Sequence, residues 1–299
     1  MNPGLWAALG AAMCWTISAT AFTEAGRRIG SIPLNLLRLV MAALILGAVL
    51  LFRPEAASGG LRDPDNWLWF GISGVLGFFF ADLCLFRAFL DIGPRRTLLA
   101  LSLAPPVSAV IGAAWLGERL VWLQWMGMAV TLVGVMWGVL EADRREIAPA
   151  GASAHRARGL VLAGTGMLMQ SISLVISKRG IGGAVTPVEA TLIRACAGIA
   201  CFAALIAVTG RIGRLRAGAR NAPAMAIIAL GAAVGPALGV VLIMRALKDV
   251  PSGIAQTVLA TTPVMIIPFA AILHRERVTP ARVCAALLAL AGVALLFRA

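Results

Sequence analysis

The sequence predicts an all-α integral membrane protein with ten transmembrane helices, arranged as two inverted five-helix repeats. First, the 299 residues are 60% hydrophobic and only 13% charged, which gives more apolar surface than a soluble domain of this length can bury. Second, apolar segments of membrane length alternate with short polar breaks. Third, the second half of the chain repeats the first at an offset of 158 residues.

The candidate spans have the length that a membrane crossing needs, since about 20 apolar residues in a helix cross about 30 Å of hydrocarbon. In chain order they cover residues 4–23, 32–52, 67–90, 96–116, 121–140, 159–178, 187–209, 222–246, 253–273 and 280–297. Little chain remains outside them, so we expect no soluble domain. The first span has neither a basic stretch before it nor a cleavage site after it, which favours a retained helix over a secretory signal.

The internal repeat runs without a gap from Phe86 to Phe297. The matched pairs are Arg87 with Arg245, Ala88 with Ala246, Asp91 with Asp249, Pro105 with Pro263, Glu118 with Glu276, Arg119 with Arg277 and Gly134 with Gly292. Each copy holds an odd number of spans, so the copies must cross the bilayer in opposite orientations, as in secondary transporters. We predict a first repeat over residues 1–140, a polar linker over 141–158 and a second repeat over 159–299.

The net charge of +13 comes mostly from basic residues in the breaks between spans. This placement is typical of contact with lipid headgroups, and it argues against a nucleic-acid partner, which would require a basic soluble face. Neither the cysteines nor His155 and His274 show the spacing of a disulfide framework or a metal site. We expect no metal, no cofactor and no catalytic residues, so transport energy would come from a gradient.

Charged residues inside the spans are the first candidate substrate contacts. A charge at membrane depth costs about 2.5–3.5 kcal/mol, so it should face a cavity or a partner. Asp82 lies deep in the third span, while Arg38 and Arg194 occupy matching places in the second and seventh. Asp82 either takes part in transport or forms a buried ion pair with Arg38. The arginines either bind substrate, form ion pairs, or extend to the membrane surface.

A polar stripe on the sixth span is the second candidate feature, and it matches an aromatic and polar stripe on the first. An apolar lining with a few placed polar groups suits a small amphipathic solute. Alternatively, the serines bond only to the preceding turn or to a neighbouring helix. The candidates on these stripes are Trp15 and Ser18 of the first span and Gln170, Ser173 and Ser177 of the sixth, and Gln256 of the ninth span is a further candidate. Pro105 and Pro263 are expected to kink their helices at cavity depth and serve in gating.

Four elements recur in the same order in both halves. They read Arg87-Ala88-Phe89, Pro105, Gly117-Glu118-Arg119 and Gly127 with Gly134 in the first, and Arg245-Ala246-Leu247, Pro263, Arg275-Glu276-Arg277 and Gly292 in the second. With this order and spacing the chain resembles the EamA-type transporters of the drug/metabolite transporter superfamily over nearly its whole length. It departs from the pattern where Arg275 replaces the glycine, and Asp82 has no charged counterpart at Val240.

The resemblance implies a bundle with a central cavity between its halves that opens alternately to either side. It further implies transport of small metabolites, such as amino acids, or of drugs, often outward, and no enzymatic activity. We therefore expect a multi-pass protein of a bacterial-type inner membrane, a monomer or homodimer, whose partners are a small-molecule substrate and the lipid bilayer. The family expectation places both termini in the cytoplasm, whereas the excess of Lys and Arg after odd-numbered spans places them outside.

Two other functions stay open. A cavity of mixed character would also admit a lipid headgroup, which is the property of a lipid-handling flippase or of a membrane module that needs a partner subunit. The segment Gly71-Ile72-Ser73-Gly74 has the form found around the nucleophile of an intramembrane serine protease, for which His274 is the available base. A duplicated ten-helix chain is not the layout of such a protease.

Overall fold

The structure is a computed structural model that describes residues 2–142, 156–181, 183, 185–265 and 279–298. Within these ranges the chain is helical and contains no β-strand, and nine helical stretches are long and apolar enough to cross a membrane. The all-α membrane class is therefore confirmed. The predicted ninth span, residues 253–273, runs beyond the described ranges, so nine is a count for the described part alone.

The helices of the two halves follow one another in similar order. The first half contains α1 (Pro3–Ile29), α2 (Ser31–Phe52), the short 3₁₀ turns η1 (Pro54–Ala56) and η2 (Gly60–Arg62), α3 (Pro64–Gly74), η3 (Val75–Ala81), α4 (Asp82–Leu101), α5 (Ala104–Leu116) and α6 (Trp122–Ala142). The second contains α7 (Arg156–Ile181), α8 (Pro187–Val208), α9 (Ile212–Ala219), α10 (Ala222–Ala232), η5 (Ala233–Gly239), α11 (Val240–Asp249), α12 (Ser252–Leu259) and α14 (Pro280–Arg298).

Several helices begin at a polar cap beside a proline. The side chains of Asn2, Asp63 and Asn221 accept hydrogen bonds from backbone N–H groups of α1, α3 and α10. At α8, Thr186 and Glu189 form a reciprocal capping box. These caps satisfy N–H groups that lack partners within the helix, and proline fits the first turn because its missing N–H is not needed there.

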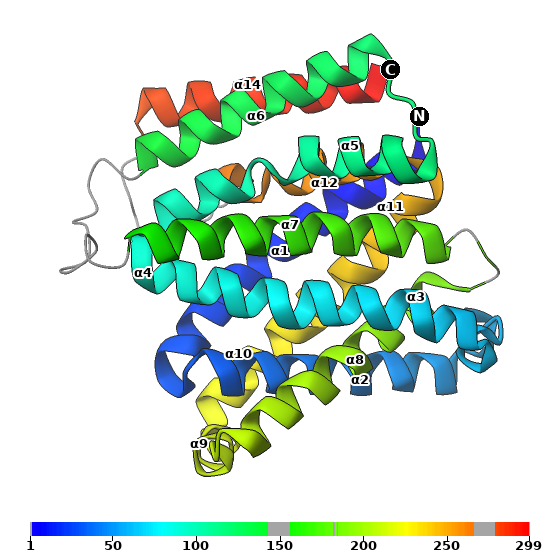
Figure 1. The fold of residues 1–299 in the computed structure, drawn as a ribbon, viewed down its shortest axis with the longest axis vertical. Helices are drawn as coiled ribbons and strands as arrows, with labels where there is room; N and C mark the ends of the chain where they lie inside the picture. Colours follow the sequence, from blue (N-terminus) through cyan, green and yellow to red (C-terminus); the bar gives the residue numbers. More distant parts are fainter. Residues whose placement is uncertain (1, 143–155, 182, 184, 266–278, 299) are drawn as a thin grey trace.

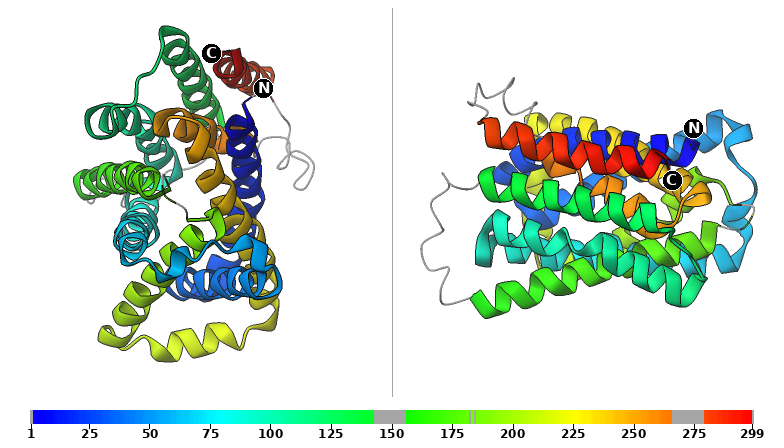
Figure 2. Two further views of the ribbon diagram at one scale, coloured as in Figure 1. Left: turned by 90° about the vertical axis from the view of Figure 1, so that its right-hand side faces the viewer. Right: turned by 90° about the horizontal axis from the view of Figure 1, so that it is seen from above.

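The closest helix pairs join one half of the chain to the other. α6 packs along α14, α4 along α7, α2 along α8, α5 along α12, and α1 along α10, η5 and α11. In Figure 1, α6 and α14 lie side by side at one edge of the bundle and α9 at the opposite edge. The ring of Trp6 in α1 lies 5.0 Å from that of Phe297 in α14, so both termini lie at the same end of the helices (Figure 2).

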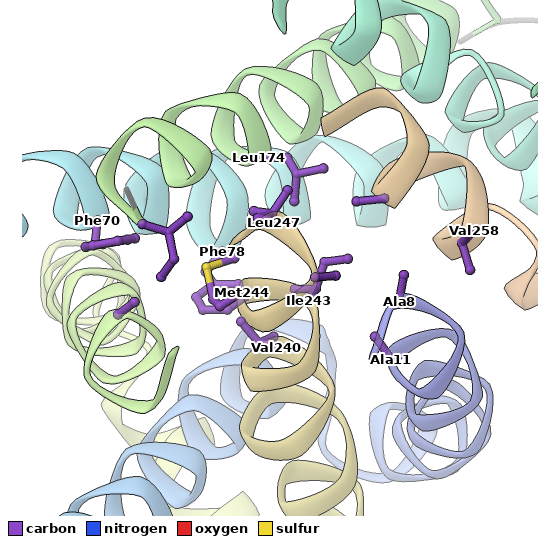
Figure 3. Close-up of a cluster of buried hydrophobic side chains, with 14 of the residues drawn as sticks. Ala8, Ala11, Phe70, Phe78, Leu174, Val240, Ile243, Met244, Leu247 and Val258 are labelled. Carbon is purple, nitrogen blue, oxygen red and sulfur yellow. The ribbon is translucent and has the colours of Figure 1, made fainter. Parts of the chain in front are cut away.

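A hydrophobic core lies where the halves meet, centred on α11. Val240, Met244 and Leu247 of α11 are buried, and the same cluster includes side chains of α1, α3 and α7. Figure 3 shows Met244 between Phe78 and Ile243, with Leu174 of α7 close to Leu247. The apolar faces of the two halves are thus buried mainly against each other.

Small residues let α6 and α14 approach closely, and they do so symmetrically. A Cβ on Gly134 would lie 2.4 Å from the backbone N of Ala289, and a Cβ on Gly292 would lie 2.4 Å from the backbone N of Thr131. Thr131 and Ala289 are themselves 158 residues apart. Such reciprocal contacts are those of a two-fold axis relating two copies of one surface.

Backbone irregularities also repeat at the same offset. The π-helical segments η3 and η5 interrupt matching helices, although only η5 contains a proline, Pro236. Turns at residues 102–103 and 260–261 likewise precede the matched prolines Pro105 and Pro263. π segments inside α-helices are rare and concentrate at functional positions. The occurrence of one in each half therefore marks η3 and η5 as candidate parts of a functional site.

Two local expectations were wrong. The predicted break between residues 90 and 96 has helical backbone and belongs to α4; the ion pair of Arg87 with Asp91, at 3.2 Å and one turn apart, stabilises helix across it. The predicted break between residues 209 and 222, which holds the basic run from Arg211 to Arg220, is not an irregular loop but is mostly the helix α9. Leu215 of α9 packs against the hydrophobic core, whereas Arg214, Arg216 and Arg220 are exposed, so this short helix has an apolar and a basic face.

Candidate substrate-binding site

Arg194 is the most unusual charged residue in the described part of the chain. It projects from α8, a third of the way along a membrane-spanning helix, and is 4% exposed. Its guanidinium donates hydrogen bonds to the hydroxyls of Ser73, Ser177 and, at 3.4 Å, Ser173. The ring of Phe78 lies 5.1 Å below its central carbon. No carboxylate of the described residues pairs with it.

The serines around Arg194 form a network of their own across the two halves. Ser73 Oγ donates to the carbonyl of Ser173 at 2.7 Å, and Ser173 Oγ donates to the carbonyl of Ser73 at 2.8 Å. Ser177 Oγ donates to the same Ser173 carbonyl at 2.9 Å. Ser73 Oγ also lies 2.6 Å from Ser177 Oγ and 3.0 Å from Ser173 Oγ, where either oxygen can be the donor. The three hydroxyls and two backbone carbonyls thus form one network, whose hydroxyl oxygens accept from Arg194.

Close backbone contact permits this arrangement. A Cβ on Gly74 would lie 2.4 Å from the carbonyl oxygen of Arg194, and one on Gly77 would lie 2.4 Å from Ser173 Oγ. Any larger side chain at either position would separate α3 from α7 and α8. The glycines flank or occupy η3, so the π segment is part of the wall around Arg194.

Arg38 occupies the matching position on α2 but has a carboxylate partner. It donates to Asp82 in an ion pair, and its guanidinium carbon lies 5.3 Å from the centre of the Phe22 ring. The side chain of Arg38 is 6% exposed and that of Asp82 is 20% exposed. Of the two readings left open for Asp82, the structure shows the ion pair.

The two arginine sites follow the internal repeat. Ser18 Oγ donates to the carbonyl of Gly231 at 3.0 Å, which matches the bond from Ser173 to Ser73 because Ser18 corresponds to Ser173 and Gly231 to Ser73. The sites differ in charge, since the position equivalent to Asp82 is Val240. One copy is thus an ion pair, and the other is an arginine that has no counter-charge among the described residues.

The remaining predicted cavity residues lie in different surroundings. Trp15 packs beside η5, where its indole Nε1 would be 3.6 Å from a Cβ on Gly239. Gln256 of α12 is 6% exposed, and its Oε1 has no hydrogen-bond partner in the part of the chain that the structure describes. Gln170 is half-buried on α7, away from the contacts of Arg194 that Ser173 and Ser177 make.

The prolines expected to kink helices lie just after turns. Pro105 is in the first turn of α5, following the turn at residues 102–103. Pro263 follows the matching turn at residues 260–261. At both places the helix is interrupted rather than smoothly bent, and a gating role for these positions stays a prediction.

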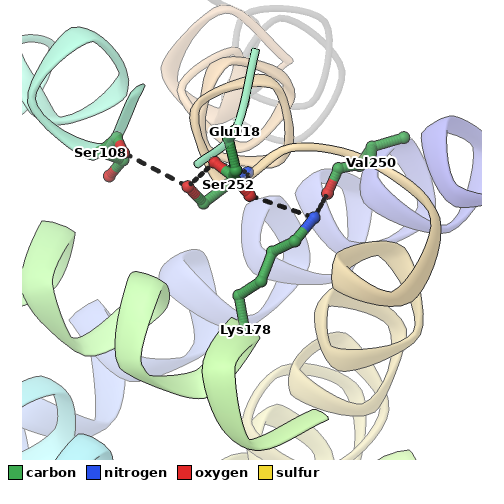
Figure 4. Close-up of polar contacts among 5 residues, drawn as sticks. All are labelled: Ser108, Glu118, Lys178, Val250 and Ser252. Carbon is green, nitrogen blue, oxygen red and sulfur yellow. Dashed lines mark hydrogen bonds and ion pairs between the residues drawn. The ribbon is translucent and has the colours of Figure 1, made fainter. Parts of the chain in front are cut away.

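Glu118 anchors a second polar cluster, which its motif alone did not reveal (Figure 4). Its carboxylate accepts from the backbone N of Ser252 at 2.9 Å and from the hydroxyl of Ser252 at 2.6 Å, and it pairs with Lys178 at 3.1 Å. The Lys178 ammonium also donates to the carbonyl of Val250. A residue of the first half therefore caps α12 of the second.

Glu189 ties together another pair of segments. Besides its capping box with Thr186, its carboxylate accepts from the backbone N and the hydroxyl of Ser58, at 3.2 and 2.7 Å. Glu189 is 1% exposed, so it holds the chain between α2 and α3 against the start of α8. It is a structural anchor in this conformation.

The protease alternative gains no support from Ser73. Its hydroxyl is fully buried, donates to a carbonyl and accepts from Arg194, whereas a nucleophile needs a base within hydrogen-bonding reach. His155 and His274 both lie outside the described residues. Among the residues that are described, no group of His, Cys, Asp and Glu has the geometry of a metal site.

Comparison with known proteins agrees with the repeat. The model of the EamA-like transporter family matches residues 2–140 and again residues 157–298. The chain belongs to the EamA-like transporter family. Members of this family are membrane transporters of the drug/metabolite type and not enzymes, so this EamA-like protein is a multi-pass integral membrane transporter with a small-molecule substrate.

Among the solved structures, a crystal structure of a protein shares the fold of this EamA-like chain. It is similar with a TM-score of 0.77 and 20% sequence identity, covering 99% of this chain and 96% of the other. At that identity the likeness concerns the fold alone. No functionally curated protein matches the chain.

Proposed function

We propose that this protein is a secondary transporter that moves small metabolites, such as amino acids and similar amphipathic solutes, or drugs by alternating access, as an exporter in a bacterial inner membrane. The observation that supports this proposal is the pair of arginines, Arg38 and Arg194, which are buried within membrane-spanning helices where the halves meet. Charges at that depth are costly to maintain. Their position suits them to bind a polar solute between the halves.

The helix interruptions support movement at the interface between the two halves. η3 and η5 lie beside the arginine sites, and the turns before Pro105 and Pro263 divide two further helices. Helix ends and irregular segments absorb backbone rotation more readily than continuous helix does. Matched interruptions in the two halves would let this interface open first at one end and then at the other.

Asp82 is the proposed site of proton coupling. It is the acidic member of the Arg38 pair and lies within a membrane-spanning segment, and a fifth of its side chain is not covered by other protein atoms. Protonation would release Arg38 to a different partner. Outward transport and the monomeric or homodimeric state are proposed on the family resemblance.

The test is transport by the purified full-length chain in liposomes, with amino acids, nucleosides and cationic drugs as solutes, with and without an imposed pH gradient. We expect saturable movement of at least one class and acceleration by the gradient. Asp82→Asn should lose the acceleration, whereas Glu24→Gln, in an exposed pair with Arg28, should keep it. An unchanged pH dependence in Asp82→Asn would remove Asp82 from the coupling step.

If the folded, inserted protein transports none of these solutes, the proposal that this chain alone is a carrier is contradicted. Activity that appears only with lipid substrates, or only after a second subunit is added, would replace it by the lipid-handling or partner-dependent alternative. Both outcomes are read in the same liposomes.

A further inference from the structure

We propose that the Nε–Nη2 edge of Arg194 binds a carboxylate group of the transported solute. This inference rests on the proposed transport function and deepens it by naming the chemical class of the substrate. A carboxylate-bearing solute, including a zwitterionic amino acid, fits this site, whereas a solute with only cationic groups does not. Three features of the structure lead to this assignment.

The first feature is the unused edge of the guanidinium. Nη1 of Arg194 donates to Ser73 and Ser177, while Nη2 makes only the long contact of 3.4 Å with Ser173. Nε is buried and has no hydrogen-bond partner among the residues that the structure describes. The serines therefore fix the guanidinium through Nη1 and leave the other edge underused.

The same chain shows what such an edge binds. Arg158 uses its Nε and Nη2 to hold both oxygens of Asp91, at 2.8 and 2.9 Å. This two-point geometry matches a planar carboxylate and is among the strongest of charge-assisted hydrogen bonds. Arg194 presents the same pair of nitrogens with no such partner.

The second feature is the local charge. Arg38 is paired with Asp82, whereas the positive charge of Arg194 meets hydroxyl groups and no carboxylate of the described residues. Phe78 offsets part of this through its ring face. A single carboxylate would complete the neutralisation, whereas a doubly charged phosphate would leave an excess negative charge in a medium of low dielectric constant.

The third feature is the difference between the repeats. Asp82 is the internal counter-ion of the Arg38 site, and its equivalent in the other copy is the apolar Val240. The Arg194 site is thus built like the first, without its acid. A carboxylate supplied by the solute would take the place of the acidic side chain that the Arg194 site lacks.

This conformation encloses the guanidinium, since Arg194 is 4% exposed and the three serines are at most 1% exposed. Access requires α3 to move away from α7 and α8, and the interface between them runs through the hydroxyl network and η3. Binding of a carboxylate at the Nε–Nη2 edge would replace only the long contact of Nη2 with Ser173 and would leave the Nη1 bonds to Ser73 and Ser177 in place. The solute would therefore bind beside the hydroxyl network once the helices have moved apart.

The experiment measures thermal unfolding of the purified full-length protein in detergent micelles with matched solutes. Each aromatic or aliphatic scaffold is offered as amino acid, amino-acid amide, amine and carboxylic acid. We expect the unfolding temperature to rise with the amino acid or the carboxylic acid of at least one scaffold, and not with its amide or amine. Equal effects of an acid and its amide on every scaffold would overturn the proposal.

Variants connect the effect to the residue. Arg194→Lys keeps the positive charge but loses the two-point edge, so apparent affinity for the stabilising carboxylate should fall at least about tenfold. The matched control Arg53→Lys, at an exposed position, should leave it unchanged. Unaltered affinity in Arg194→Lys would overturn the proposal, and if the variant fails to fold, the wild-type solute series decides alone.

The liposome test of transport and the unfolding test of carboxylate binding can each fail without the other. Movement in liposomes of amines or cationic drugs, with carboxylates neither carried nor bound, would uphold the carrier and reject the carboxylate site. Stabilisation by carboxylates without transport of any solute would uphold the site and reject the carrier.

Discussion

Ser73 and Ser173 exchange hydrogen bonds, each hydroxyl donating to the backbone carbonyl of the other, at 2.7 and 2.8 Å. The residues are 100 positions apart, and they join α3 of the first half to α7 of the second. Arg194 of α8 donates to both hydroxyls. Three membrane-spanning helices are thus joined at one polar point inside an apolar bundle, and the bond between the halves is also the support of the buried charge.

This reciprocal pair should show coupled energetics. Ser73→Ala and Ser173→Ala should each cost about 1–2 kcal/mol, because each leaves a buried group without its partner. The double variant should cost less than the sum of the two, since one network is lost only once. The measurement is unfolding in detergent micelles, with Ser102→Ala as control because that hydroxyl bonds only within its own turn. Strictly additive losses would mean that the two bonds act independently.

The ion pair of Arg38 and Asp82 predicts an asymmetry between single and double variants. Asp82→Ala should destabilise the protein by roughly 2–3 kcal/mol, because the buried guanidinium loses its counter-charge. Arg38→Met combined with Asp82→Ala should recover most of that loss. Glu24→Ala, which breaks an exposed pair with Arg28, should change stability by less than about 0.5 kcal/mol. A double variant less stable than Asp82→Ala alone would contradict this account.

The sequence sufficed for much of the architecture. Apolar length and polar breaks located the nine spans that the described residues contain. The offset of 158 residues paired Gly134 with Gly292, and the structure shows that the paired residues make reciprocal contacts, because packing contacts are inherited with a duplicated surface. The in-span charges Arg38, Asp82 and Arg194 were conspicuous for their cost in lipid. The ion pair was one of the readings that this cost suggested.

Other parts of the site were beyond sequence reasoning. Ser73 stood out only as part of a protease-like segment, because its partners are distant in the chain and a serine in a span is unremarkable. The π segment η3 contains no proline to mark it. Glu118 belonged to a recognisable turn, but nothing local shows that it caps a helix of the other half, since Ser252 is 134 residues away.

The glycine contacts between α6 and α14 predict sensitivity to a single methyl group. Gly134→Ala and Gly292→Ala should each lower stability by about 1–3 kcal/mol, because the new Cβ would overlap backbone atoms that cannot move aside easily. Gly47→Ala in α2 is the matched control, with nothing within 4 Å of its Cβ position. Thermal unfolding of the three variants in one detergent gives the comparison. Equal behaviour of all three would show that α6 and α14 separate at little cost.

The last prediction separates the two charged residues of the Gly-Glu-Arg turn. Glu118→Ala removes the acceptor of the Ser252 amide and hydroxyl and leaves Lys178 without its ion-pair partner. Loss of such a cap costs about 1 kcal/mol or more, so amide hydrogen exchange in the first turn of α12 should accelerate about fivefold to tenfold. Arg119→Ala, at an exposed neighbouring position, should leave that exchange unchanged. If Arg119→Ala accelerated it as much as Glu118→Ala, the turn and not the carboxylate would be responsible, and the link between the halves at α12 would have to be assigned to the backbone around Gly117.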